Sequence, residues 1–235
     1  MTTKGNLLDL GQRGYAEVWE LQRKLVDLRA RKLIPDSLIL VEHPHVFTVG
    51  KAVSGDIPPQ IDGVPVFRIE RGGQWTYHGF GQIVGYPILD LNERERDIHR
   101  FLRNIEQTLI LTISKFNIAG GRGEQTGVWV GNKKIASIGA AIRKWVSFHG
   151  FALNANTDLS YFYKINPCGF SGSTMTSMKA LLGRDLNVGE VKQEVRNRFE
   201  EVFDLDLIDA RLNPGTSRGY IIRSLKSDYA TWPNL

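Results

Sequence analysis

A single cysteine in a turn-forming stretch is the first residue of this 235-residue chain that could do covalent chemistry. Cys168 follows Pro167 and precedes Gly169, and these neighbours restrict one backbone angle and permit tight local geometry. Two interpretations are open. A lone thiol is often a small buried apolar residue, whereas a thiol beside a base or cation is a nucleophile, because the thiolate is the reactive form. Lys134, His78 and His149 are the candidates for that neighbour.

Lys134 stands directly before a strand of small and apolar residues, Ile135-Ala136-Ser137-Ile138-Gly139. A lysine beside a turn is usually solvated, and this is the expectation for Lys133. We expect the ammonium group of Lys134 to reach the edge of a tight cavity instead. There it could lower the pKa of a thiol and relay protons.

The segment from Arg71 to Gln82 alternates glycines with aromatic residues. Glycines allow a ligand to approach the backbone, so the segment forms either one wall of a ligand groove or a bulged hairpin of a packed sheet. Its glycine spacing matches neither the P-loop nor the dinucleotide fingerprint. His78 and His149 are each followed by glycine, and we expect them to line the same site from two strands.

Composition excludes several classes of function. The five histidines form no set with metal-ligand spacing, and no run of about 18 apolar residues could span a membrane. The net charge of +5 without blocks of like charge argues against nucleic acid and favours acidic partners. The N-terminal residues show no secretory signal, and one cysteine forms no internal disulfide, so we expect a cytoplasmic protein.

Hydrophobic periodicity predicts the elements that position these residues. Three helices are expected: 15–31, a helix that opens at Asn92, and 188–203. The second carries an apolar stripe of Ile98, Leu102, Ile105, Leu109, Ile113 and Phe116 and ends at Gly120-Gly121. The expected strands are 37–42, 46–49, 65–69, 75–78, 83–91, 127–130, 134–139 and 146–154.

Turn signals connect these strands into hairpins. The Gly131-Asn132 turn pairs the strands on either side of it, and 75–78 is expected to pair with 83–91. Residues 50–63 should form a loop, 157–178 a loop with short helical turns, and the tail beyond Pro214 stays unassigned. This pattern predicts one α+β domain over residues 1–235, with helices on a mixed, largely antiparallel sheet.

Several of these segments together resemble the lipoyl(octanoyl) transferase family. The resemblance spans roughly residues 8–207. The matching motifs are Glu42-His43-Pro44, Thr48-Val49-Gly50, Arg71 to His78, Gly81-Gln82, Tyr86-Pro87, Gly127 to Val130, Lys134 to Gly139, Phe148 to Asn154, and Ile165 to Gly169.

The resemblance implies a fold similar to the biotin and lipoate protein ligases and a two-step octanoyl transfer without cofactor or metal. It implies that Cys168 carries the acyl thioester and that Lys134 lowers the thiol pKa and acts as acid and base. The substrate-binding residues it implies are Arg71, Gly72, Gly73, Gln74, Trp75, Thr76, Tyr77, His78, Ser137, Ile138, Gly139, Gly150, Phe151 and Ala152.

The implied partners are octanoyl-acyl carrier protein as donor, and as acceptors the lipoyl domains of 2-oxoacid dehydrogenase E2 subunits and the glycine cleavage H protein. One alternative is an ATP-dependent lipoate or biotin protein ligase, for which Gly120-Gly121-Arg122-Gly123 resembles a glycine loop. Another is a module that only docks these partners. The third is specific nucleic-acid binding, which we do not expect.

Overall fold

Two sheets form the framework of the protein. The computed structural model describes residues 2–94, 96–165, 172–215 and 219–224. The larger sheet has the order β13-β12-β1-β2-β7-β11-β10-β9-β8, and the smaller has the order β4-β5-β3-β6. The larger sheet contains β1 (Thr3–Gln12), β2 (Ser37–Glu42), β7 (Gln82–Ile88), β8 (Gly121–Arg122), β9 (Gly127–Val130), β10 (Lys133–Arg143), β11 (Val146–Asn154), β12 (Leu205–Gly215) and β13 (Gly219–Ser224). The smaller contains β3 (Val46–Val49), β4 (Gln60–Ile61), β5 (Val64–Arg68) and β6 (Trp75–His78).

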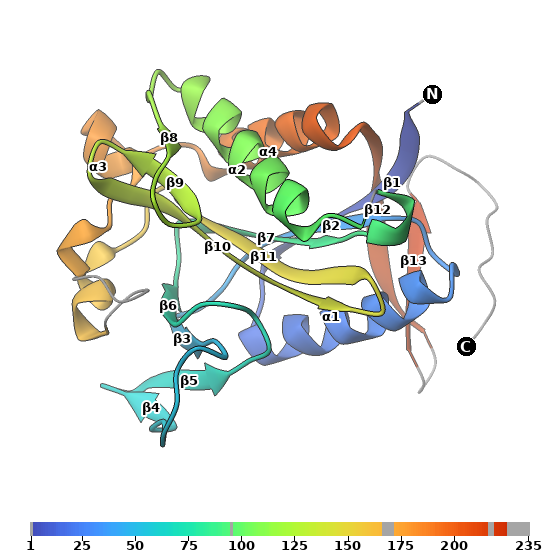
Figure 1. The fold of residues 1–235 in the computed structure, drawn as a ribbon, viewed down its shortest axis with the longest axis horizontal. Coiled ribbons are helices and arrows are strands. Elements are labelled where there is room, and N and C mark those ends of the chain that lie inside the picture. Colours follow the sequence, from blue (N-terminus) through green and yellow to red (C-terminus); the bar gives the residue numbers. More distant parts are fainter. Residues whose placement is uncertain (1, 95, 166–171, 216–218, 225–235) are drawn as a thin grey trace.

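Helices cover both faces of the larger sheet. The helices are α1 (Tyr15–Ala30), α2 (Ile98–Ser114), α3 (Met178–Leu182) and α4 (Val188–Phe203), with 3-10 turns at Leu91–Glu93, Leu159–Lys164 and Gly172–Thr174. Helices α2 and α4 lie side by side on one face and α1 lies on the other (Figure 1). No helix of the described residues is long and apolar enough to cross a membrane.

Each face has its own apolar core. Buried residues of α2 and α4, such as Leu109 and Phe199, share a cluster on one face, and Val18 and Leu25 of α1 belong to the cluster on the other. This arrangement confirms the α+β class and the predicted helices of residues 15–31 and 188–203. The predicted strands are also present, with β10 extending to Arg143 and β4 interrupting the expected loop of residues 50–63. The strand predicted over 83–91 ends at Ile88, and a 3-10 turn begins at Leu91.

The predicted start and end of the second helix were wrong. Helix α2 begins at Ile98, because the Asp97 carboxylate accepts a hydrogen bond from the Arg100 backbone N–H at 2.9 Å and caps it there. It ends at Ser114, and Asn117 has a left-handed backbone with φ of 61°. Ile98 is exposed, and Leu102 and Phe116 are only partly buried, so the buried stripe is shorter than expected.

The predicted pairing of strands 75–78 and 83–91 was also wrong. Strand β6 pairs with β3 in the smaller sheet, whereas β7 lies between β2 and β11 in the larger one. Gly81 carries the chain across with a φ of +74°. Its N–H donates to the Glu42 carboxylate at 3.1 Å and its carbonyl accepts from Asn156 N at 2.8 Å. These long-range bonds replace a hairpin turn.

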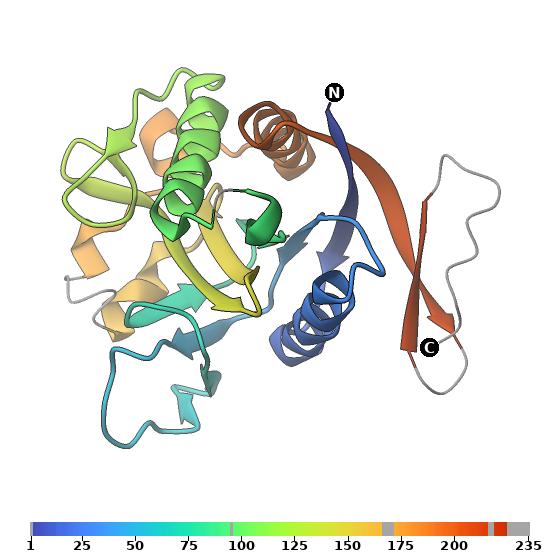
Figure 2. The same ribbon diagram turned by 45° about the vertical axis from the view of Figure 1, so that its right-hand side comes forward.

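The strands at the two ends of the chain were not predicted. Strand β1 lies between β2 and β12 and runs parallel to both, and β12 with β13 forms the far edge of the sheet (Figure 2). Leu7 belongs to the α2 and α4 core and the adjacent Leu8 to the α1 core. A strand covered on both faces lacks the alternation that identifies half-buried strands.

Candidate functional site

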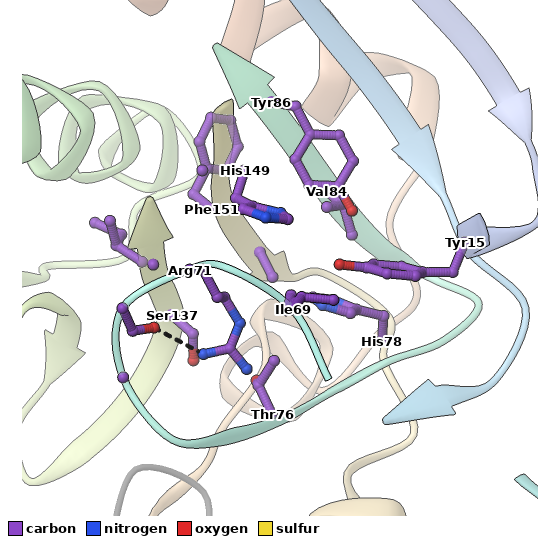
Figure 3. Close-up of a pocket in the computed structure, with 16 residues that line it drawn as sticks. Tyr15, Ile69, Arg71, Thr76, His78, Val84, Tyr86, Ser137, His149 and Phe151 are labelled. Carbon is purple, nitrogen blue, oxygen red and sulfur yellow. Dashed lines mark hydrogen bonds between the residues drawn. The ribbon is translucent and has the colours of Figure 1, made fainter. Parts of the chain in front are cut away.

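A pocket lies where β7, β10 and β11 meet the segment that joins β5 to β6 (Figure 3). It encloses about 40 Å³. Its lining residues are Tyr15, Ile69, Arg71, Gly72, Gly73, Thr76, His78, Val84, Tyr86, Ser137, Ile138, Gly139, His149, Gly150, Phe151 and Ala152. The lining thus combines residues from both sheets and from the first turn of α1.

Glycines allow close contacts at this point, both between β10 and the Arg71 loop and between the paired strands β7 and β11. A Cβ on Gly139 would lie 3.0 Å from Arg71 Cδ, and one on Gly150 would lie 2.3 Å from the Gly85 carbonyl oxygen. The Gly72 N–H donates to the Ala140 carbonyl of β10 at 3.1 Å. Backbone contact of this kind holds the loop of residues 71–73 directly over β10.

Arg71 is the charged residue of the pocket wall. Its side chain is buried, and its guanidinium donates to the Thr48 carbonyl at 2.9 Å, to the Thr48 hydroxyl at 3.1 Å and to the Gly72 carbonyl at 3.0 Å. The fixed fork of the guanidinium therefore ties the loop to β3. A buried cation at this position favours a ligand that presents an oxygen acceptor.

Three buried histidines are neutral at pH 7: His78 and His149, which line the pocket, and His43, which packs against His78. Burial lowers the pKa of His43 to about 4, of His78 to about 3 and of His149 to about 4. The His43 Nδ1–H donates to the Arg13 carbonyl at 2.7 Å, and the Tyr86 hydroxyl donates to His43 Nε2 at 2.8 Å. Burial also raises the pKa of Tyr86 well above its usual range. The histidines and Tyr86 are therefore uncharged at pH 7, in contrast to Arg71.

Tyr15 and Glu70 hold two of these rings in place. The Tyr15 ring lies nearly parallel to that of His78, with centroids 5.9 Å apart (Figure 3). His149 Nε2 lies 3.3 Å from a Glu70 carboxylate oxygen. Partial burial by itself would raise the pKa of Glu70, but hydrogen bonds from the backbone, Arg23 and Trp19 outweigh it and lower the pKa. Glu70 is therefore an anion that accepts the Nε2 proton of His149.

Lys134 is buried on the strand that carries the pocket residues Ser137 and Gly139. Its side chain is 2% exposed, and its Nζ lies 5.4 Å from the centroid of the Trp129 ring. This confirms the expectation that Lys134, unlike the exposed Lys133, is not a solvated turn residue.

A bulge in β10 brings Lys134 to the same face of the sheet as Ser137. The pairing of β10 with β9 shifts between Lys134 and Ala136, and Ile135 and Ala136 both belong to the core under α2 and α4. Side chains otherwise alternate between the faces of a strand. Two consecutive residues on one face therefore put Lys134 and Ser137 together on the other, about 10 Å apart along the strand.

Glu106 of α2 supports the surface on which Lys134 rests. A Cβ on Gly127 would lie 2.5 Å from Lys134 Cε, so only glycine fits beneath the lysine, and its φ is +140°. The Gly127 N–H donates to the Glu106 carboxylate at 3.1 Å. That carboxylate is 1% exposed and also pairs with Arg103 at 2.7 Å and Arg122 at 3.1 Å. Helix α2 thus fixes the strand against which the lysine packs.

The structure brings most of the predicted substrate-binding residues together. All of them except Gln74, Trp75 and Tyr77 line the pocket. Gln74 and Trp75 line a separate open hollow, and Tyr77 packs in an aromatic cluster, parallel to Tyr161 at 4.7 Å. The predicted nucleophile Cys168 lies outside the described residues. Its role and the binding roles stay predictions.

Sequence reasoning missed part of the pocket. Tyr15, Ile69, Val84 and Tyr86 line it but were not expected there, although Tyr86 lies in a quoted motif. Tyr15 gives no local signal, because the first residue of an amphipathic helix is ordinarily a core position. The expectation that His78 and His149 line one site is confirmed. Among the described residues, no group of three or more His, Cys, Asp or Glu side chains could hold a metal ion.

Comparison with known proteins identifies relatives over most of the chain. Residues 14–200 match the lipoyl protein ligase A/B catalytic domain family. The octanoyltransferase of Flavobacterium psychrophilum is 42% identical over 228 residues, covering 86% of this chain and 97% of the relative. The octanoyltransferase of Geotalea uraniireducens is 44% identical over 201 residues, covering 85% and 93%.

Solved structures share the fold at low identity. A lipoate-protein ligase A bound with ATP superposes with a TM-score of 0.67 at 15% identity, covering 91% of this chain and 90% of the other. A bipartite lipoate protein ligase of Thermoplasma acidophilum gives 0.64 at 18%, covering 90% and 88%. The biotin protein ligase of Aquifex aeolicus gives 0.51 at 12%, covering 86% and 69%. These likenesses confirm the predicted similarity of fold.

Proposed function

This chain belongs to the lipoyl protein ligase A/B catalytic domain family, and on that premise we propose that it is an acyltransferase that moves octanoyl groups onto lysines of lipoyl domains. The observation that carries this proposal is the identity of more than 40% with several octanoyltransferases over most of the chain. The finer steps below rest on the site geometry and on general chemistry.

In the proposed first step, the Cys168 thiolate attacks the thioester carbonyl of octanoyl-acyl carrier protein. The bond from the carbonyl carbon to the carrier sulfur breaks, and the released carrier thiolate takes up the proton of the Lys134 ammonium, which leaves Lys134 neutral for the second step. One thioester replaces another, so the step is close to energetic balance. A cation near a thiol favours the thiolate, and the buried Lys134 ammonium is the proposed source of that cation.

In the second step, the ε-amine of a lipoyl-domain lysine attacks the Cys168 thioester. A C–N bond forms, the C–S bond breaks, and the amine loses a proton, which Lys134 accepts in its neutral form. The product is an amide, and conversion of a thioester into an amide is strongly downhill. Splitting the transfer into two steps is the advantage of covalent catalysis.

The pocket is the proposed site of the octanoyl chain. Val84, Phe151 and Ala152 supply apolar surface, and burial of a methylene group contributes about 0.8 kcal/mol. The distance of about 10 Å between Lys134 and Ser137 along β10 is comparable to the length of an extended eight-carbon chain. The enclosed 40 Å³ holds about three water molecules, so the lining side chains rearrange when the chain enters.

The same proposal includes the setting and the partners. The donor is octanoyl-acyl carrier protein, and the acceptors are the lipoyl domains of 2-oxoacid dehydrogenase E2 subunits and the glycine cleavage H protein. The cytoplasm is the proposed compartment, because a thiol nucleophile has to stay reduced. The net charge of +5 favours encounter with acidic carrier proteins.

Intact-protein mass spectrometry tests the proposal. After mixing with octanoyl-acyl carrier protein without ATP, the wild type should gain one octanoyl group that hydroxylamine removes, and Cys168→Ser should gain none that hydroxylamine removes. Lys134→Ala should slow formation of the adduct about 10²- to 10⁴-fold, the usual contribution of a positioned acid or base. Lys144→Ala, at the exposed turn between β10 and β11, should react at the wild-type rate.

Two outcomes would contradict it. Absence of the adduct, with acylation of a lipoyl domain from free acid and ATP, would establish the ligase alternative. A wild-type rate in Lys134→Ala would remove that residue from the mechanism.

A further inference from the structure

We propose that Gln82 and Asn154 are positioning residues that hold His78 as its Nδ1–H tautomer and thereby join the pocket wall to the strand that carries Lys134. The kinetic consequence of this inference rests on the proposed octanoyl transfer. The assignment of the His78 tautomer is independent of that function.

The orientation of the Asn154 amide is set by a backbone carbonyl. Asn154 Nδ2 donates to the Thr176 carbonyl at 2.9 Å, and a carbonyl oxygen can only accept. The Oδ1 atom of Asn154 therefore faces Gln82, whose Nε2 donates to it at 2.9 Å. Gln82 Nε2 donates its second proton to the Tyr77 carbonyl at 3.1 Å. Both Gln82 amide protons are used, and Gln82 Oε1 must face the other way.

Gln82 Oε1 lies 2.8 Å from His78 Nδ1. Because an amide oxygen is only an acceptor, the imidazole proton has to be on Nδ1. His78 is neutral at pH 7, since burial lowers its pKa to about 3, so Nε2 carries no proton. The tautomer of His78 thus follows from the Thr176 carbonyl through two amides.

The bare Nε2 atom of His78 faces β3. It lies 3.5 Å from the Thr48 hydroxyl, at the long end of the hydrogen-bond range. That hydroxyl accepts from Arg71 at 3.1 Å, so its own proton is available for His78 Nε2. The tautomer therefore keeps the Thr48 hydroxyl in the orientation in which it accepts from the Arg71 guanidinium at the pocket.

The other end of the series reaches Lys134. The Thr176 N–H donates to the Lys134 carbonyl at 3.0 Å, and Met175 forms a parallel bridge with Lys134. Thr176 therefore bonds to both sides: its N–H donates to the Lys134 carbonyl, and its carbonyl accepts from the Asn154 side chain. The start of β10 and the wall of the pocket are linked through a single series of hydrogen bonds.

Burial makes this series specific. Gln82 and Asn154 are each 1% exposed, and Thr48 is 0% exposed, so water is not at hand to replace a lost partner. With the other tautomer, the Nδ1 lone pair would face Gln82 Oε1 and leave two acceptors opposed. A buried polar group without a partner is unfavourable enough to exclude that arrangement.

Nitrogen-15 NMR of the histidine side chains, on the whole protein at pH 7 without substrate, tests the tautomer. Wild-type His78 should show a protonated Nδ1 and an unprotonated Nε2. Gln82→Met removes the acceptor and should shift His78 toward the Nε2–H form. Gln82→Glu keeps an oxygen for Nδ1 and should preserve the Nδ1–H form although it loses both donors. The exposed Gln193→Met on α4 is the matched control and should leave the signal unchanged.

Steady-state kinetics of the same variants test the positioning role. Gln82→Met should lower kcat/KM for octanoyl transfer at least tenfold, mostly through KM for the octanoyl donor, and Gln82→Glu should recover part of that loss. Asn154→Asp keeps the acceptor for Gln82 but loses the donor to Thr176. It should keep the tautomer and lower kcat, because it disturbs the side that carries Lys134.

Outcomes separate this inference from the proposed function. His78 in the Nε2–H or charged form in the wild type, or a tautomer that Gln82→Met leaves unchanged, would overturn the inference. If Gln82→Met does not fold, the assignment is tested by the wild type and Gln82→Glu alone, where loss of the Nδ1–H form would overturn it. A wild type with the expected tautomer but no octanoyl transfer would overturn the proposed function and support the tautomer assignment.

Discussion

Two buried polar clusters of this protein differ in their charge: one consists of ion pairs around Arg29, and the other contains neutral histidines. Beneath the end of α1, Arg29 lies between carboxylates, and its guanidinium is 2.7 Å from Asp36, 3.4 Å from Asp90 and 2.6 Å from Glu93. Around the pocket, the histidines are neutral, and their ring nitrogens bond to neutral side chains or to a backbone carbonyl, except that His149 Nε2 donates to the Glu70 carboxylate.

The charged cluster uses up its hydrogen-bonding capacity within the protein. Asp36 accepts from Arg29, from the Asp90 N–H at 2.9 Å and from Arg94 at 3.1 Å, and Arg94 also donates to the Phe203 carbonyl at 2.8 Å. Its members come from α1, from the start of β2 and from the turn after β7. They connect these segments, and we assign the cluster to the fold.

The neutral cluster leaves its polar groups facing a pocket. A ligand with a long apolar chain and one polar end fits a wall that combines apolar and neutral side chains with the Arg71 guanidinium. The comparison teaches that burial alone does not distinguish a structural polar cluster from a functional one. The surroundings do, because the charges around Arg29 bind one another, whereas His78 and His149 line a pocket.

The largest expected effect is that of breaking the charged cluster. Asp36→Ala removes the buried carboxylate that lies 2.7 Å from Arg29, and removal of one partner of a buried ion pair destabilises a protein by about 3 to 5 kcal/mol. Urea denaturation should show this loss at pH 7. A loss below about 1 kcal/mol would mean that water compensates for the missing carboxylate, and the contrast between the clusters would fail.

The second largest effect is expected from acid, which should lower the unfolding free energy through the buried histidines of the neutral cluster. The pKa of His43 is about 4 in the folded protein and about 6.5 in an unfolded chain, so the unfolded state binds more protons between these values. Stability is therefore complete above pH 6.5 and falls as the pH is lowered, by up to about 1.4 kcal/mol per pH unit for each such histidine. His43→Gln should reduce the slope of unfolding free energy against pH by this amount. Equal slopes for variant and wild type would show that His43 is not buried in its neutral form.

We expect the smallest change in unfolding free energy for an exposed ion pair that belongs to neither cluster. Asp185 pairs with Lys179 at 2.7 Å, but the two side chains are 70% and 49% exposed. Exposed pairs contribute at most about 1 kcal/mol and often nothing measurable. Asp185→Ala should change the unfolding free energy by less than about 0.5 kcal/mol in the same urea experiment. A loss similar to that of Asp36→Ala would show that charge pairing matters here regardless of burial.

Much of the fold and part of the site were predictable from local patterns. The apolar spacing of α1 and α4, the turn at Gly131 and Asn132, and the glycines around Arg71 are all signals within short windows, and each corresponds to an observed element or wall. Lys134 was identified as an exception among lysines because small apolar residues follow it. These features depend on the backbone preferences of single residues and on the spacing of apolar side chains, both of which can be read within a short stretch of sequence.

Only the tertiary structure decided which strands pair and which side chains meet. Strands β6 and β7 belong to different sheets because Glu42 and Asn156 bind the Gly81 backbone. Tyr15 of helix α1 reaches His78 of strand β6, and the bulge at Ile135 turns Lys134 to the face of Ser137. Each of these depends on contacts between residues far apart in the chain. Whether such a contact forms is settled by the packing and the hydrogen bonds of the whole core, which no short window of sequence contains.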